Sequence, residues 1–73
     1  MPEFKDKVHF KNARSTSSTE RAVYCILEND HGLWVPKSQI DDDSEVYDKY
    51  QEGELVVSLW IAEEKEILDY ASK

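Results

Sequence analysis

Cysteine, glycine and long hydrophobic runs are scarce in this 73-residue chain, and each shortage excludes a class of protein. The single cysteine, Cys25, has no partner for an intramolecular disulfide, so a reducing, cytoplasmic setting is expected. With only two glycines, the chain lacks a glycine-rich loop that could cradle a phosphate. Its apolar runs fall far short of the roughly 20 residues that span a bilayer, so neither a signal peptide nor a membrane anchor is predicted.

The composition predicts one small folded domain over residues 1–73. Hydrophobic residues make up 40% of the chain and charged residues 34%, which is enough apolar material for a compact core. A chain of this length buries roughly 60% of its unfolded surface and has no material for a second core.

The net charge of −7 is unevenly distributed along the chain. Residues 1–21 hold five basic and three acidic residues, a net +2, whereas residues 22–73 hold four basic and thirteen acidic residues, a net −9. The larger part of the chain should therefore repel nucleic acid and attract basic proteins.

Hydrophobic periodicity predicts two strands in the first half of the chain. Phe4, Val8 and Phe10 alternate with basic residues over residues 4–11, which is typical of a strand with one buried face. Residues 20–27 carry apolar side chains on both faces and predict a central strand covered on both sides. Between them, residues 15–19 (STSST) are short and polar, which predicts a flexible loop.

Turn-forming and helix-capping residues predict the elements of the second half of the chain. Residues 29–32 (NDHG) predict a β-hairpin whose returning strand ends at Pro36. Residues 41–53 predict either an acidic loop or a short helix, and residues 55–57 a strand. Ser58 is a candidate N-cap for a helix over residues 59–71. The expected fold is α+β: a small antiparallel sheet of three to four strands with one C-terminal helix packed on it.

Candidate catalytic and metal-binding groups are weak. Cys25, His9 and His31 do not occur at metal-ligand spacings. The acidic run starting at Asp41 has Val46 where a calcium-binding EF-hand loop requires glycine. No serine lies in a nucleophile-elbow pattern. We therefore expect no enzymatic activity, no catalytic residues, no metal and no cofactor.

One alternative is an accessory nucleic-acid-binding domain. A basic stripe near the N-terminus could contact phosphates while an aromatic side chain stacks on bases; the stripe consists of Lys5, Lys7, Lys11 and Arg14. The negative net charge disfavours direct nucleic-acid binding, and these residues are equally explained as a solvated face.

The favoured hypothesis concerns the acidic, tyrosine-bearing segment that follows the hairpin. Carboxylates along a surface can imitate the phosphates of a nucleic acid, and aromatic side chains supply rigid contact area. The candidate partner-binding residues are Trp34, Lys37, Asp41, Asp42, Asp43, Glu45, Tyr47, Asp48, Tyr50 and Glu52. An acidic loop that confers only solubility explains the same residues.

Two stretches, ERAVYCILENDHGLWVPKSQI and GELVVSLWIAEEKEI, carry a resemblance over residues 20–67. They resemble a family of small bacteriophage and prophage proteins in which a W-x-P-K-S hairpin precedes a strand-Trp-helix unit. The matching positions here are Trp34, Pro36, Lys37, Ser38, Trp60 and the stretch 63–65. The chain departs from the pattern at residues 58 and 59, where a proline would be expected. The resemblance implies a phage origin, a bacterial host cell and the same fold.

Together these features predict a non-enzymatic, acidic protein-binding module of a phage or mobile element. It would inhibit or modulate a defence, replication or recombination protein by occupying its basic, nucleic-acid-binding surface. Besides the nucleic-acid-binding alternative, a structural protein that forms homodimers through an exposed sheet edge is a third hypothesis.

Overall fold

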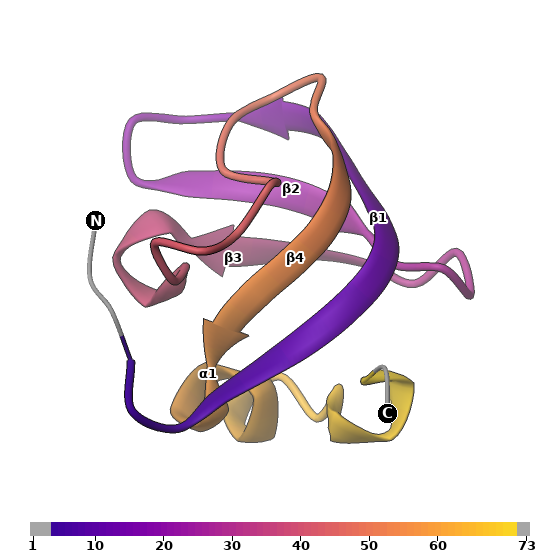
Figure 1. The fold of residues 1–73 in the computed structure, drawn as a ribbon. Coiled ribbons are helices and arrows are strands. Elements are labelled where there is room, and N and C mark those ends of the chain that lie inside the picture. The colour runs from indigo at the N-terminus through magenta and orange to yellow at the C-terminus, as the bar shows by residue number, and fades with distance from the viewer. Residues whose placement is uncertain (1–3, 72–73) are drawn as a thin grey trace.

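The computed structural model describes residues 4–71 and contains one four-stranded antiparallel sheet (Figure 1). The strands follow the order β3-β2-β1-β4 across the sheet. Their bounds are β1 Lys7–Ser18, β2 Ala22–Ile26, β3 Gly32–Pro36 and β4 Glu52–Ser58. One α-helix, α1 Leu59–Glu64, and two 3-10 helices, η1 Lys37–Gln39 and η2 Leu68–Tyr70, complete the elements. This confirms the predicted α+β fold.

Strand β1 is long and strongly bent because two irregularities interrupt its ladders. Its register with β4 shifts between Phe10 and Ala13, where Asn12 has a φ of 57°. Its register with β2 shifts between Ser15 and Ser17. Such bulges increase local twist, so β1 curves away from β2 toward β4, and β4 crosses in front of β2 and β3 (Figure 1). The two halves of the sheet therefore face each other across the core.

The core lies inside this curl and is made of aliphatic side chains together with Phe10 and Cys25. The largest fully buried apolar side chains are Phe10, Leu27, Ile40, Leu55 and Ile67. Within β2, Val23 and Cys25 are fully buried, whereas Ala22, Tyr24 and Ile26 are only partly buried. The prediction that both faces of this strand are covered was therefore wrong: β2 is internal in the sheet, but only one of its faces meets the core.

The predicted flexible loop over residues 15–19 was also wrong, because β1 continues to Ser18. Ser15 is buried, and its hydroxyl donates to the main-chain carbonyl of Asp48 and accepts from Gln51 N at 3.0 Å. These contacts replace the local hydrogen bonds that favour loops in serine-rich segments. The turn itself occupies residues 19–21 and is closed by Thr19 N donating to Ala22 O at 2.7 Å.

The hairpin predicted at residues 29–32 is confirmed between β2 and β3. Leu27 N donates to His31 O at 2.9 Å, and Asp30 takes the left-handed conformation with a φ of 64°. The Tyr24 ring lies across Gly32, where a Cβ would overlap the tyrosine hydroxyl. Glycine is therefore needed at the start of β3 so that Tyr24 can lie on the outer face.

Helix α1 begins as predicted and ends earlier. The Ser58 hydroxyl accepts from Ile61 N at 3.2 Å and caps the helix, which buries Ile61 and Ala62. The predicted end at residue 71 was wrong, because α1 stops at Glu64 and Glu66 adopts a φ of 56°. This reversal directs Ile67 into the core. Within residues 4–71, no helix is long and apolar enough to cross a membrane.

Candidate protein-recognition surface

The segment between η1 and β4, residues 40–51, is here called the acidic connection, and its first half is hydrogen-bonded along the outer edge of β4. Ile40 forms a β-bridge with Val57. Asp41 N donates to Val56 O at 2.8 Å, and Glu45 N donates to Glu54 O at 2.8 Å. Val46 is fully buried in the core. Of the two alternatives predicted for residues 41–53, the loop is correct for residues 41–51, while residues 52 and 53 belong to β4.

Asp41 is the structural centre of this half and cannot be a partner contact, contrary to the sequence prediction. Its side chain is fully buried, and its carboxylate accepts from Phe4 N at 2.7 Å, Asp43 N at 2.9 Å and Lys7 Nζ at 3.4 Å. The two backbone donors, then Lys7, lower the pKa of Asp41 below its ordinary value. A buried carboxylate with these partners fixes a turn instead of meeting a ligand.

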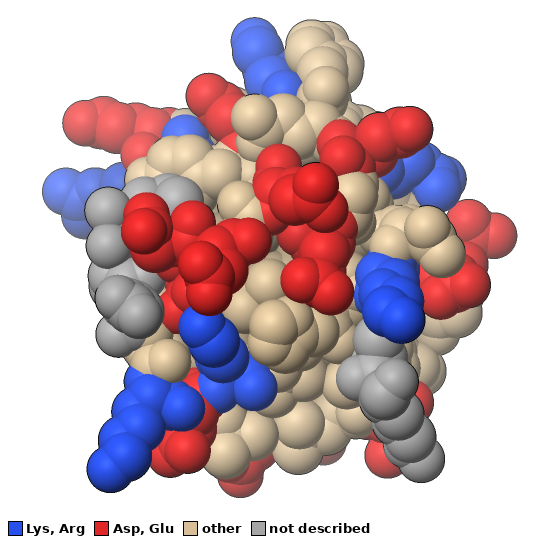
Figure 2. Space-filling model, in the orientation of Figure 1, with Lys and Arg blue, Asp and Glu red and all other residues tan. Residues whose placement is uncertain are grey.

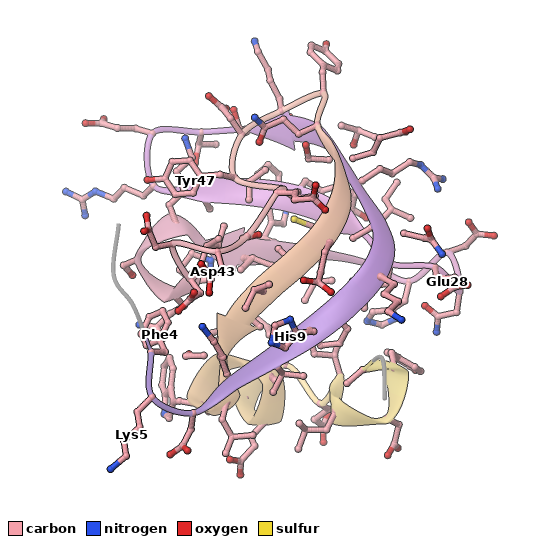
Figure 3. The ribbon with its side chains drawn as sticks, in the orientation of Figure 1. Phe4, Lys5, His9, Glu28, Asp43 and Tyr47 are labelled. Carbon is pink, nitrogen blue, oxygen red and sulfur yellow. The ribbon has the colours of Figure 1, made fainter. Side chains whose placement is uncertain are left out.

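Lys7 joins this turn to β1. Its Nζ lies 2.8 Å from Asp43 Oδ2, and this hydrogen bond is the main reason that its pKa is raised. Figure 3 shows Phe4 beside the turn that carries Asp43. Lys7 thus ties the N-terminal part of the chain to the acidic connection.

The proposed basic stripe is interleaved with carboxylates. Besides Lys7, Arg14 lies 3.7 Å from Asp30, and His9 Nδ1 lies 3.1 Å from Glu54 Oε1. Lys5 and Lys11 are exposed. The bulge at Asn12 also breaks the alternation on which a continuous basic stripe depends.

The second half of the acidic connection is fixed by residues of β1 and by Gln51. The Gln51 side-chain carbonyl accepts from the amides of Tyr47 and Asp48, both at 2.7 Å. Tyr50 N donates to Ser15 O at 3.0 Å. Ser18 Oγ donates to Asp48 Oδ1 at 2.7 Å, and this bond is the leading cause of the lowered pKa of Asp48. The roles of Ser15, Ser18 and Gln51 were not predicted, because at least 30 residues separate the serines from their partners.

Several predicted contact residues meet at this end. Lys37 Nζ lies 3.8 Å from Asp48 Oδ1 and 5.7 Å from the centroid of the Tyr47 ring. At the tip, Tyr50 is 80% exposed with a φ of 60°, and Lys49 Nζ lies 5.7 Å from its ring centroid. A bulky side chain rarely adopts positive φ, so the backbone bond to β1 holds Tyr50 outward at a conformational cost.

The remaining acidic residues form an exposed cluster over β4. Glu45 Oε1 accepts from Glu54 N at 2.9 Å, which places Glu45 across Gly53, while Glu52 and Glu54 alternate with that glycine along the strand. Figure 2 shows acidic side chains gathered at the middle of this face. Asp42, Glu45 and Glu52 are exposed.

Trp34 is separated from this group by the topology of the sheet. It lies on β3, the strand at the opposite edge from β4, and packs edge-on against Tyr24 with ring centroids 5.3 Å apart. The structure therefore brings together Lys37, Tyr47 and Asp48, and it leaves Trp34 with β2.

No group of three or more histidine, cysteine, aspartate or glutamate side chains in the described part of the chain could hold a metal ion. No family model, curated protein or solved structure matches this chain.

Proposed function

We propose that this protein is a non-enzymatic binding module whose acidic face engages the basic surface of a nucleic-acid-processing protein as a nucleic-acid mimic. The observation that carries the proposal is the fixed position of the acidic connection. Its backbone is bonded to β4 and β1, Val46 is buried beneath it, and the side chains of Asp42 and Glu45 are exposed.

Fixed carboxylates favour recognition because little conformational entropy is lost when a partner binds. Three acidic side chains, Asp42, Glu45 and Glu52, are exposed, so a cationic groove could reach them directly. The net charge of −7 would accelerate encounter with such a groove and make association weaken as salt rises.

The tyrosines supply the apolar part of the contact. Tyr50 is almost fully exposed at the tip, and Tyr47 is partly buried beside Lys37. Tyrosines with few rotatable bonds and a polar tip are common interface anchors. Tyr50 and Tyr47 would therefore flank the carboxylates at one end of the contact surface.

The biological setting we propose is a phage or other mobile element in a bacterial host. There, the module would inhibit or modulate a defence, replication or recombination protein by competing with DNA or RNA for its basic surface. This setting follows from the charge distribution and from the resemblance of residues 20–67 to small phage proteins.

The proposal is tested with two variants that change the net charge equally. The triple variant Asp42→Asn, Glu45→Gln, Glu52→Gln removes three exposed carboxylates of the acidic face, and Glu63→Gln, Glu64→Gln, Glu66→Gln removes three exposed acids on and just after α1. Each is immobilised for capture of host proteins at low salt, with elution at high salt. Loss of captured basic nucleic-acid-binding proteins only with the first variant supports the proposal. Equal capture by both variants contradicts it, because net charge alone would then explain the binding.

A further inference from the structure

Within residues 4–71, no strand lies beside the outer edge of β3. At the two ends of the β2–β3 ladder, His31 O accepts from Leu27 N, and Lys37 N donates to Arg21 O. Residues 31 and 37 therefore turn their backbone groups toward β2, and alternation along the strand turns those of residues 33 and 35 the same way. The N–H and C=O groups of Gly32 and Trp34 consequently point away from β2, whereas the C=O of Pro36 belongs to the first turn of η1.

Exposed aromatic surface flanks this edge. Trp34, at the middle of β3, is 43% exposed although it packs against Tyr24. Tyr70 of η2 is also 43% exposed, and its ring lies 5.1 Å from that of His31, just before β3 begins. An uncovered strand edge beside exposed aromatic side chains is a typical site of strand addition.

We propose that β3 pairs with β3 of a second copy of this chain, antiparallel and in the register that places Trp34 opposite Trp34 on the two-fold axis. In this register each Trp34 N–H donates to the other Trp34 C=O. Pro36 has no N–H, and its C=O begins η1, so the self-complementary pairing is centred on Trp34 and does not extend to the end of β3.

The side chains agree with this register. Directly opposed aromatic residues on neighbouring strands stabilise a sheet, and here two Trp34 indoles meet, each supported by a Tyr24. Antiparallel pairing also brings the end of β3 near Glu28 and Asp30 beside the end near Arg21 and Lys37 of the other copy. Most of these charges are already balanced within each copy, because Arg14 lies 3.7 Å from Asp30, Lys37 lies 3.8 Å from Asp48 and Glu20 adjoins Arg21. The ends of the two strands therefore do not oppose this register.

This interface is independent of the proposed acidic surface and has the opposite response to salt. Two copies of net charge −7 repel each other, and salt screens that repulsion. Dimerisation should therefore strengthen as salt rises, whereas binding of a basic partner should weaken. The two proposals can fail separately.

The test is sedimentation velocity from micromolar to millimolar protein at low and high salt. Wild type should shift from monomer to dimer with increasing concentration, and more readily at high salt. Trp34→Lys, which places a charge on the edge, should raise the dissociation constant by about tenfold or more. The matched control Trp60→Lys, which changes a 61% exposed tryptophan on α1, should dimerise like wild type. A wild type that stays monomeric at millimolar concentration overturns the proposal, as does dimerisation unaffected by Trp34→Lys.

Amide hydrogen exchange of the wild type tests the register without any mutation. The inward amides of Leu33 and Val35 should be protected at every concentration. That of Trp34 should exchange fast in dilute solution and become protected as the dimer forms. If this amide remains unprotected when dimers are present, another surface mediates association and the proposed register is wrong.

Discussion

The two edge strands of this sheet differ in whether another segment of the chain covers their outer edge. The outer edge of β4 is occupied by the acidic connection, which bonds to Val56 and Glu54 and inserts Ile40 and Val46 into the core. The outer edge of β3 has a half-exposed tryptophan at its centre and, within residues 4–71, no further strand beside it. The same sheet thus has one edge closed by its own chain and one edge left open.

This difference shows how an acidic segment can be structural and outward-facing at the same time. Proteins protect strand edges with charged residues and covering loops. The acidic connection covers the edge of β4 and also carries charged residues. Asp41 turns inward to fix the turn, while Asp42, Glu45 and Glu52 remain outside. On β3 the only such protection in the strand itself is the shortness of the strand and Pro36 at its end.

The largest effect should follow from weakening the closed edge at its core. Ile40→Ala removes a fully buried side chain at the bridge to Val57, and we expect the free energy of unfolding to fall by about 2–5 kcal/mol. Urea denaturation followed by tryptophan fluorescence measures this change. A loss well below 1 kcal/mol, within the range of ordinary surface substitutions, would mean that the connection is not part of the packed core.

The next effect concerns the charge that fixes the turn. The pKa of Asp41 is lowered from its ordinary 3.8, so its contribution to stability is present above that value and is lost as pH falls through the folded-state pKa. The pKa of Lys7 is raised from 10.5, so its contribution is present below that value and is lost at higher pH. We expect Asp41→Asn to lower the melting temperature at neutral pH and to flatten the acid limb of the stability profile. Asp42→Asn, at an exposed neighbour, is the control and should change neither.

A smaller effect is expected where the closed edge meets α1. The Ser58 hydroxyl donates to Gln39 Oε1 at 2.6 Å and accepts from Ile61 N, so it joins η1 to the helix start. Ser58→Ala should lower the free energy of unfolding by about 0.5–2 kcal/mol. Chemical denaturation measures it, and Ser58→Asp should recover part of the loss because aspartate also caps helices.

The smallest effect should come from the open edge. Trp34→Ala removes the ring contact with Tyr24, which stabilises the fold by about 0.5–1.5 kcal/mol in addition to the hydrophobic contribution of the buried surface. The substitution leaves no enclosed cavity, because the indole is half exposed. The decrease in the free energy of unfolding, measured by urea denaturation at concentrations where the protein is monomeric, should be clearly smaller for Trp34→Ala than for Ile40→Ala. Equal costs would remove the distinction between the two edges.

The buried thiol of Cys25 offers a chemical probe of how each substitution affects opening of the core. Burial raises the pKa of the Cys25 thiol to about 12, so almost no reactive thiolate forms at neutral pH. A thiol reagent should label Cys25 only when the protein opens. The labelling rate should increase with Ile40→Ala and change little with Trp34→Ala.

The parts of the fold that depend on local signals were predictable. The hairpin at Asn29–Gly32, the strand end at Pro36 and the cap at Ser58 each depend on neighbours within a few residues. The burial of Asp41 was not, because it depends on a hydrogen bond from the amide of Phe4, 37 residues away. The strand through Ser18 was not, because Ser17 and Ser18 pair with Tyr24 and Val23 of β2 although short polar side chains favour a loop. The end of α1 was misplaced because the apolar spacing of residues 67 and 71 continues past the reversal at Glu66.

The candidate surface was predictable in composition and not in arrangement. The run of acids and tyrosines was visible in the sequence, but nothing local distinguished the inward Asp41 from the outward Asp42. Trp34 was grouped with the acids by proximity in sequence, whereas the sheet order places it on the strand at the opposite edge.

The central claim, that the acidic connection is a fixed strand-edge cover, is tested most directly by amide hydrogen exchange of Asp41, Glu45 and Tyr50. Their N–H groups donate to the main-chain carbonyls of Val56, Glu54 and Ser15, respectively. All three amides should exchange more slowly than those of an unstructured peptide, by about two orders of magnitude or more. This slowing corresponds to a local opening free energy of about 3 kcal/mol. Exchange of all three at the rate of an unstructured peptide would show a loose tether and contradict the account.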